Sequence, residues 1–166
     1  MNCPFVLVLW ARFIDFLPKL SQTVHNPPLE LIYSDLWGPP PMNSHCQFRY
    51  YTSFVNAYSR LTWIYFLKNK SDALSVFKQF KSLVELQFNK KIKAIQTDWG
   101  GEFRVFSSFL SELGIVHRLT CSHTHHQNGV VERKHRHIVE LGLSQLSHAS
   151  LPLSFGIMLF KLLCIS

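Results

Sequence analysis

Cysteine is scarce in this chain and long apolar runs are missing, and both facts exclude classes of protein. The 166 residues include four widely separated cysteines, none of them in a C-x-x-C pair. They therefore fit neither a disulfide framework nor a zinc site and are expected to be reduced intracellular thiols. No apolar stretch approaches the roughly 20 residues that a membrane-spanning helix needs, and residues 5–10 lack the positive leading region of a signal peptide. We expect no membrane partner and no secretion.

Acidic residues are few as well. Ten Asp and Glu stand against 17 Lys and Arg, which gives a formal net charge of +7 and a pI near 9.4. Such a balance favours an anionic partner, with nucleic acid as the first candidate, although charge alone fits a merely basic domain equally well. Hydrophobic residues make up 47% of the chain, so it has the composition of a folded domain rather than a disordered segment.

The apolar pattern from residue 29 onward predicts an α/β domain. Residues 1–28 show no clean period and end in Asn26-Pro27-Pro28, so we interpret them as a poorly determined lead-in. Alternation predicts a strand at 29–35, and aromatic and β-branched residues predict strands at 48–55 and 61–67. Short strands are expected at 92–97 and 115–119, and helices at 71–89, 106–113 and 130–147. A hairpin feeding a sheet that is completed through helical crossovers is an α/β arrangement.

Three acidic residues stand where these elements begin or end. Asp35 closes the first predicted strand, Asp98 follows the fourth, and Glu132 lies in the first turn of the last helix. Side chains at strand ends and helix starts can converge on one site. Any one of them alone would more often be a solvated surface charge, but the rigid Trp-Gly sequences that follow both aspartates favour a site.

Converged carboxylates need counter-charges. Coulomb's law gives a repulsion of about 4 kcal/mol per pair at about 4 Å with an effective dielectric near 20. Hard oxygen ligands suit Mg²⁺ or Mn²⁺ rather than zinc. Two such ions can activate a water or a sugar hydroxyl and stabilise the leaving oxygen of a phosphodiester. The acids and the basic charge together predict phosphoryl transfer on a polynucleotide.

Five segments carry a family resemblance: LELIYSDLWGP, YYTSFVNAYSRLTWIYFL, IQTDWGGEF, GIVHRLTCSHTHHQNGVVERKHRHIVE and LPLSF. Together they resemble the integrase catalytic core of copia-type LTR retrotransposons, especially those of plants, with residues 29–150 as the core. The resemblance implies a ribonuclease-H-like fold with a mixed five-stranded sheet flanked by helices. It also implies that Asp35, Asp98 and Glu132 form a triad that binds two Mg²⁺ or Mn²⁺ ions. The implied reaction is strand transfer, in which a 3′-hydroxyl of element DNA attacks a phosphodiester of target DNA.

The resemblance also implies partners and a place of action. DNA is expected as partner at the element ends and at the target, with a homo-multimer as the active form. The expected location is the nucleus when target DNA is joined and the cytoplasm otherwise. Related integrases hold the DNA end with the loop before the last helix and with that helix, which corresponds here to Asn128, Arg133, His135 and Arg136. Helical spacing puts Val131, Ile138, Gly142 and Ala149 on the core side of the same helix.

Three features depart from the family pattern. The interval between Asp98 and Glu132 is slightly shorter than is common, and Asn56 stands where relatives often carry Asp. From Phe155 the chain reads FGIMLFKL in place of a family-like FWDYAFQT. Deleting one base from codons for FWDYAFQT shifts the reading frame and gives FGIMLFKL. We therefore interpret residues 151–166 as a frameshifted or truncated tail.

Two other functions fit the same residues. A ribonuclease-H-like nuclease also uses clustered acids, and cleavage of an RNA–DNA hybrid would favour it. A non-catalytic nucleic-acid-binding remnant of a decayed element is the other alternative, favoured if Asp98→Asn leaves metal-dependent activity unchanged.

Overall fold

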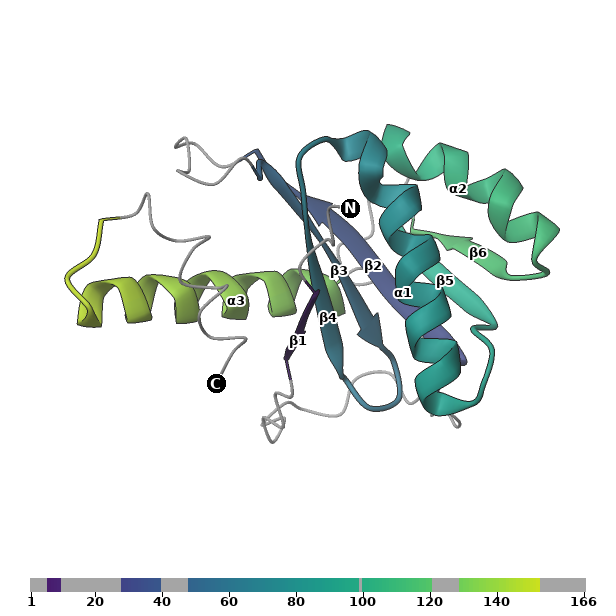
Figure 1. The fold of residues 1–166 in the computed structure, drawn as a ribbon, viewed down its shortest axis with the longest axis horizontal. Helices are drawn as coiled ribbons and strands as arrows, with labels where there is room; N and C mark the ends of the chain where they lie inside the picture. Colours follow the sequence, from purple (N-terminus) through teal and green to yellow (C-terminus); the bar gives the residue numbers. More distant parts are fainter. Residues whose placement is uncertain (1–5, 10–27, 40–47, 99, 121–128, 153–166) are drawn as a thin grey trace.

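The computed structural model describes residues 6–9, 28–39, 48–98, 100–120 and 129–152, which form one sheet with helices on both faces (Figure 1). The elements, in chain order, are β1 (Val6–Leu9), β2 (Leu31–Trp37), β3 (Tyr50–Asn56), β4 (Thr62–Leu67), a 3-10 turn η1 (Lys70–Asp72), α1 (Ala73–Phe88), β5 (Ala94–Thr97), α2 (Gly101–Glu112), β6 (Val116–Leu119) and α3 (Gly129–His148). None of the helices in these ranges is long and apolar enough to cross a membrane.

The sheet is mixed, with the strand order β1-β4-β3-β2-β5-β6. The pairs β1–β4, β4–β3 and β3–β2 are antiparallel, whereas β2–β5 and β5–β6 are parallel. The predicted five-stranded mixed sheet is confirmed, and its strands lie in the order β4-β3-β2-β5-β6. β1 adds a sixth strand at the β4 edge, inside the predicted lead-in. The sequence analysis did not predict it, because periodicity alone cannot tell a short run of apolar residues in a strand from one in a buried helix.

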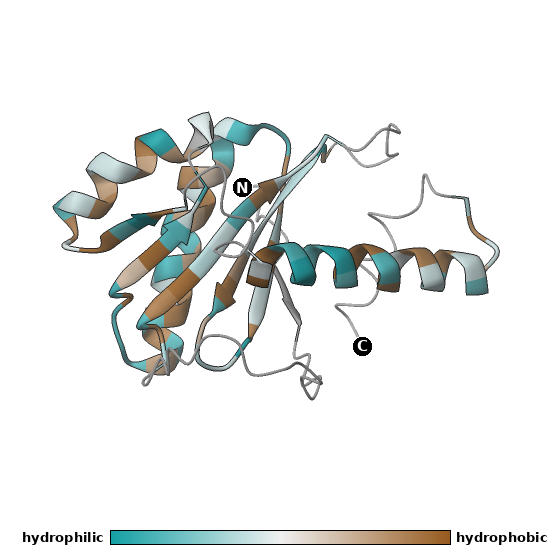
Figure 2. Cartoon of the chain, turned by 180° about the vertical axis from the view of Figure 1, so that it is seen from behind, coloured by the Kyte–Doolittle hydropathy of each residue, from teal (hydrophilic) through white to brown (hydrophobic). Residues whose placement is uncertain are grey.

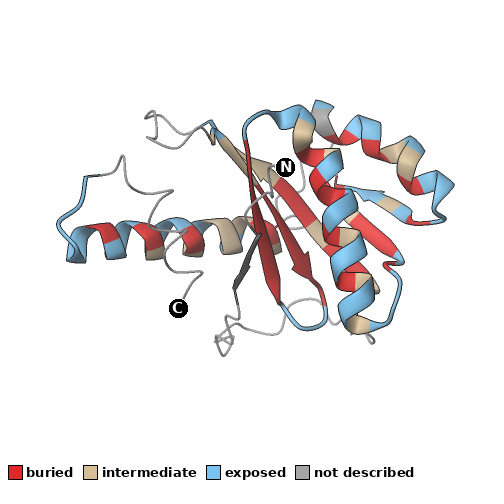
Figure 3. Ribbon diagram, in the orientation of Figure 1, coloured by how far each residue is buried: buried red, intermediate tan, exposed pale blue. Residues whose placement is uncertain are grey.

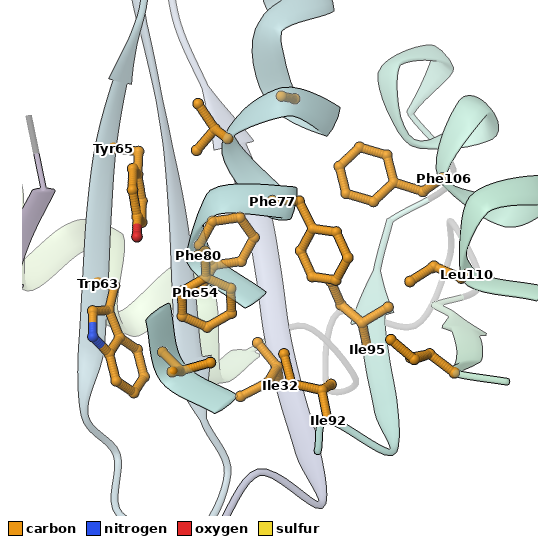
Figure 4. Packing of buried hydrophobic residues seen from close by; sticks show 14 of the residues in the cluster. Ile32, Phe54, Trp63, Tyr65, Phe77, Phe80, Ile92, Ile95, Phe106 and Leu110 are labelled. Carbon is orange, nitrogen blue, oxygen red and sulfur yellow. The ribbon is translucent and has the colours of Figure 1, made fainter. Parts of the chain in front are cut away.

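One face of the sheet packs against α1 and α2 and holds the main core (Figures 1 and 4). Alternate strand residues supply Phe54, Trp63 and Tyr65, and helical spacing in α1 supplies Phe77 and Phe80. The Phe54 and Phe80 rings stack with centroids 4.2 Å apart and an interplanar angle of 10°. This aromatic packing fixes α1 on the central antiparallel strands, which are buried along most of their length (Figure 3).

α3 lies across the opposite face. Ile138 of α3 packs against Ile64 and Phe66 of β4, and the C-terminal half of the helix continues past the edge of the sheet (Figure 2). The predicted core side is confirmed for Val131, Ile138 and Gly142, which are buried together with Leu146. Ala149 was wrongly placed on that side; it is exposed because α3 ends at His148 and the helical period ends with it.

α2 starts earlier than the sequence predicts. The glycine pair before residue 103 carries a turn signal, and the prediction therefore began the helix at residue 106. In the structure Gly100 precedes the first helical residue, Gly101, and the Phe103 N–H donates to the Gly100 carbonyl oxygen at 3.0 Å. The two glycines therefore mark the start of α2 and not a separate turn before it.

Asn56 shapes the turn between β3 and β4. Its side-chain oxygen accepts a hydrogen bond from the Tyr58 N–H at 3.2 Å, and its N–H donates to the Leu61 carbonyl oxygen at 2.9 Å. Asn56 is level with Ile32 in the β2–β3 register, three residues before Asp35. The departure from the family pattern at this position therefore affects a turn and not the surroundings of Asp35.

Candidate active site

Asp35 lies in β2, and Asp98 directly follows the adjacent parallel strand β5. The β2–β5 register pairs Leu31 with Ala94 and Tyr33 with Gln96, and one further step of two residues brings Asp35 level with Asp98. Adjacent strands are about 4.8 Å apart, and residues two apart share a face of the sheet. Asp35 thus belongs to the face that α3 covers, whereas Ile32 and Ile95 point into the main core. If the alternation of β5 continues for one residue past Thr97, Asp98 shares the face of Asp35.

Asp35 is an almost buried acid within β2. It is 7% exposed, its Oδ1 accepts the Leu36 N–H at 2.9 Å, and its carbonyl oxygen accepts the Thr52 hydroxyl at 3.0 Å. β2 continues two residues beyond it to Trp37 and then turns at Gly38, whose φ of +119° favours glycine. A Cβ at that position would also clash with the Arg49 carbonyl oxygen. The turn therefore sets where β2 ends and how far Asp35 lies from that end.

Asp98 follows β5 and is half-buried. Its Oδ1 accepts the Gly100 N–H at 3.2 Å, and its carbonyl oxygen accepts the Thr97 hydroxyl at 2.8 Å. Because the Thr97 hydroxyl proton is used in that bond, Thr97 Oγ1 acts as an acceptor toward His117 and receives its Nε2–H at 2.9 Å. His117 Nδ1 then accepts the Ser107 hydroxyl at 3.0 Å. A neutral histidine thus links α2 and β6 to the strand end that carries Asp98.

Burial lowers the pKa of His117 from its ordinary value, which makes stability depend on pH. The unfolded chain takes up this proton below pH of about 6.5, whereas the folded chain takes it up only at lower pH. The contribution of His117 to the free energy of unfolding is therefore expected to be fully present above that pH and to decrease as the pH drops toward the folded-state pKa. His117→Gln should flatten this dependence in urea unfolding measured above and below that pH. An equal pH slope in both proteins would contradict the role of His117.

Glu132 lies in the first turn of α3, and α3 contacts β2. Three residues later, the His135 ring stacks on Trp37 with ring centroids 3.5 Å apart and an interplanar angle of 5°. His135 Nδ1 is also hydrogen-bonded to the Tyr51 hydroxyl. The N-terminal part of α3 is thus fixed against the face of the sheet that carries Asp35.

The aspartates supply the hard oxygen ligands that a divalent ion such as Mg²⁺ prefers. Asp35 and Asp98 suit Mg²⁺, which usually takes one or two protein carboxylates and completes its shell with water and substrate phosphate. Across the described ranges, however, no three His, Cys, Asp or Glu side chains lie close enough to hold one ion together. That Asp35, Asp98 and Glu132 act together as a triad therefore stays a prediction. Mutual repulsion of three carboxylates opposes such a cluster in the protein by itself.

The residues predicted to contact DNA differ in their surroundings. Arg133 and Arg136 are exposed on α3, as a phosphate contact requires, whereas His135 is half-buried against Trp37 and Tyr51. Asn128, the histidines of the preceding loop and the tail from residue 153 lie outside the described residues.

The sequence analysis did not single out Trp37 or Tyr51. Strand alternation puts Trp37 on the same face as Asp35, two residues away, and Tyr51 lies directly opposite Trp37 in the β2–β3 register. Aromatic residues at these positions indicate a contact surface for α3 beside Asp35, but they can be recognised as neighbours only once the β2–β3 register is known.

Comparisons with known proteins identify the family to which the chain is similar. The family model of the integrase core domain matches residues 25–125. The chain is 47% identical over 135 residues to the retrovirus-related Pol polyprotein from transposon RE2 of Arabidopsis thaliana, covering 81% of this chain and 9% of that protein. It is 48% identical over 157 residues to the corresponding RE1 polyprotein, covering 93% and 10%. The chain therefore spans about a tenth of the length of these relatives.

A solved structure with the same fold is the HTLV-2 integrase catalytic core domain in complex with magnesium, in its dimeric form. The TM-score is 0.55 at 23% sequence identity, and the match covers 81% of this chain and 84% of that one. The expected ribonuclease-H-like fold is thereby confirmed.

Proposed function

Since the chain belongs to the integrase core domain family, we propose that it is the catalytic core of a retroelement integrase that joins the 3′ ends of element DNA to target DNA. The observation that supports the proposal is the parallel β2–β5 register, which, extended by one step of two residues, puts Asp98 level with Asp35. Two acids on adjacent parallel strands, beside a helix with exposed arginines, form a site suited to a phosphodiester substrate.

In this proposal Asp35 and Asp98 hold Mg²⁺ or Mn²⁺, and Glu132 is the third acid, approaching from α3. The chemistry that two bound ions supply is activation of the attacking hydroxyl and stabilisation of the leaving oxygen. The chain itself fixes the two aspartates through backbone pairing of β2 and β5, and the Thr97 and His117 hydrogen bonds hold the Asp98 end. The exposed Arg133 and Arg136 neutralise phosphates of the bound DNA.

A joining assay tests the proposal. The chain is incubated with oligonucleotides that carry the terminal sequences of the element that encodes it and with a labelled target duplex. We expect joined products in Mg²⁺ or Mn²⁺ and none when a chelator is present. Cleavage of an RNA–DNA hybrid without any joining would instead favour the nuclease alternative.

The alternative is a non-catalytic nucleic-acid-binding remnant of a decayed element, and the basic balance of the chain, with 17 Lys and Arg against 10 acids, suits it equally well. This alternative predicts salt-dependent DNA binding with no metal-dependent product in the same assay. The two proposals therefore differ in one readout.

DNA is the proposed partner, which the balance of 17 Lys and Arg to 10 acids supports. The proposed active form is a homo-multimer, which the dimeric form of the HTLV-2 core supports. The proposed location is the nucleus when target DNA is joined and the cytoplasm otherwise. Sedimentation with and without end DNA would measure the assembly.

Arg136→Ala is expected to weaken DNA binding and to reduce the slope of log K against log salt concentration by about 1, because one phosphate contact is lost. Arg136 is exposed on α3. The matched control is Arg104→Ala, which removes the same charge from an exposed position of α2 on the other face of the sheet. Equal slopes for both variants would mean that Arg136 does not contact DNA.

A further inference from the structure

Three aromatic side chains join α3 to the strands beside Asp35, and we name them the α3 clamp: Trp37 of β2, Tyr51 of β3 and His135 of α3. Trp37 and Tyr51 are directly opposite each other in the β2–β3 register. The His135 ring stacks on Trp37 at 3.5 Å and lies over Tyr51 at 5.8 Å, with an interplanar angle of 19° to Tyr51. One imidazole thus contacts both strands.

The protonation states of the clamp agree with a fixed hydrogen bond. Burial, and next the negative charge of Asp35, raise the pKa of Tyr51, so its hydroxyl stays protonated. Burial lowers the pKa of His135, so the ring is neutral at neutral pH. The Tyr51 O–H therefore donates to the unprotonated Nδ1 of His135. This bond occupies Nδ1 and, together with the Trp37 stack, fixes the orientation of the imidazole ring.

The position of the clamp links the two parts of the proposed site. His135 is three residues after Glu132, which is about 4.5 Å along the helix axis. Trp37 is two residues after Asp35, which is about 6.6 Å along β2. Tyr51 in turn packs on Phe66, against which Ile138 also packs. The clamp therefore joins the α3 turn next to Glu132 to the β2 segment next to Asp35.

We propose that His135 is a positioning residue for the integrase reaction: through Trp37 and Tyr51 it holds the start of α3, with Glu132, over the Asp35 face, and it does not contact DNA. This inference rests on the proposed function for its effect on joining, and on the contacts alone for its effect on α3.

The test compares three variants. His135→Ala removes the stack and the hydrogen bond, and Tyr51→Phe removes only the hydrogen bond. His148→Ala is the matched control, because it removes an exposed histidine from the last turn of the same helix. The measurements are kcat for joining, Kd for end DNA with its salt dependence, and hydrogen exchange of the α3 amides.

For His135→Ala we expect kcat to fall about 10- to 100-fold, the range found when residues that orient metal-binding side chains are removed. Kd and its salt slope should stay unchanged, and the first turns of α3 should exchange faster. Tyr51→Phe should show a smaller loss of the same kind, and His148→Ala none. A weaker Kd with kcat unchanged in His135→Ala would overturn the inference, because that is the result of a DNA contact.

Failure of the proposed function can be distinguished from failure of the clamp. If the unmodified chain joins no DNA, the proposed function has failed, and hydrogen exchange still decides on the clamp. Faster exchange at the start of α3 in His135→Ala, but not in His148→Ala, would support it. Equal protection in His135→Ala and the unmodified chain would overturn it whatever the activity.

Discussion

Asn in place of Asp35 is expected to lower the rate of Mg²⁺-dependent DNA joining by at least about 10³-fold. Metal-ion stabilisation of a phosphoryl transition state amounts to several kcal/mol, and each about 1.4 kcal/mol is a factor of ten in rate. Asn keeps the shape of the side chain but not its charge, and the Leu36 N–H can still donate to its oxygen. DNA binding should persist, because phosphate contacts come from basic side chains.

Asp98→Asn and Glu132→Gln should have effects of the same order, and the second of these decides whether the third acid belongs to the site. Glu112→Gln is the control, since it neutralises an exposed acid at the end of α2. Joining rates are compared under saturating Mg²⁺ and DNA. Retained joining in any one of the three variants would remove that residue from the proposed triad.

Phe80→Ala is expected to destabilise the fold by about 3–5 kcal/mol, the range for removing a large buried aromatic side chain. Phe80 is fully buried, stacks on Phe54 and meets the edge of Trp63 with ring centroids 5.2 Å apart. A domain of this size has a total stability of about 5–15 kcal/mol, so the loss should be a large fraction of it. The midpoint of urea unfolding would measure it.

Leu86→Ala is the matched control for Phe80→Ala, because both residues lie on α1 and Leu86 is 86% exposed. A surface change of this kind should alter the free energy of unfolding by no more than about 0.5 kcal/mol. Equal losses in the two variants would mean that the aromatic packing under α1 does not hold the helix on the sheet.

The fold was largely readable from the sequence because its strongest signals are periodic. Alternation in β2, the aromatic and β-branched residues of β3 and β4 and the helical spacing of Phe77 and Phe80 in α1 predict these elements, and their core-facing residues are buried. β1 was missed because its apolar residues do not alternate, and the start of α2 was missed because glycines precede it. Local pattern alone cannot report which distant strand will pair with a short apolar segment.

The candidate site was only partly readable. The sequence marked Asp35 and Asp98 by their places relative to strands, and the parallel register brings them level. It placed His135 among the residues that contact DNA, and this stays a prediction; the contacts with Trp37 and Tyr51 depend on strand register and helix rotation, which spacing along the chain does not encode. Asn128 and residues 153–166 lie outside the described residues, so the predictions made for them also stay predictions.

The pairing of β2 with β5 also determines where this gene can gain or lose codons. Deleting one residue between Ala94 and Asp98 would transfer the Asp98 carboxylate to the opposite face, against the aromatic core, because side chains alternate along a strand. The interval between Asp98 and Glu132 contains β6, whose register with β5 imposes the same constraint, so a one-residue deletion inside Val116–Leu119 would also reverse the faces of the residues beyond it. The spacing from Ala94 to Asp98 is therefore the one on which the proposed site depends most directly.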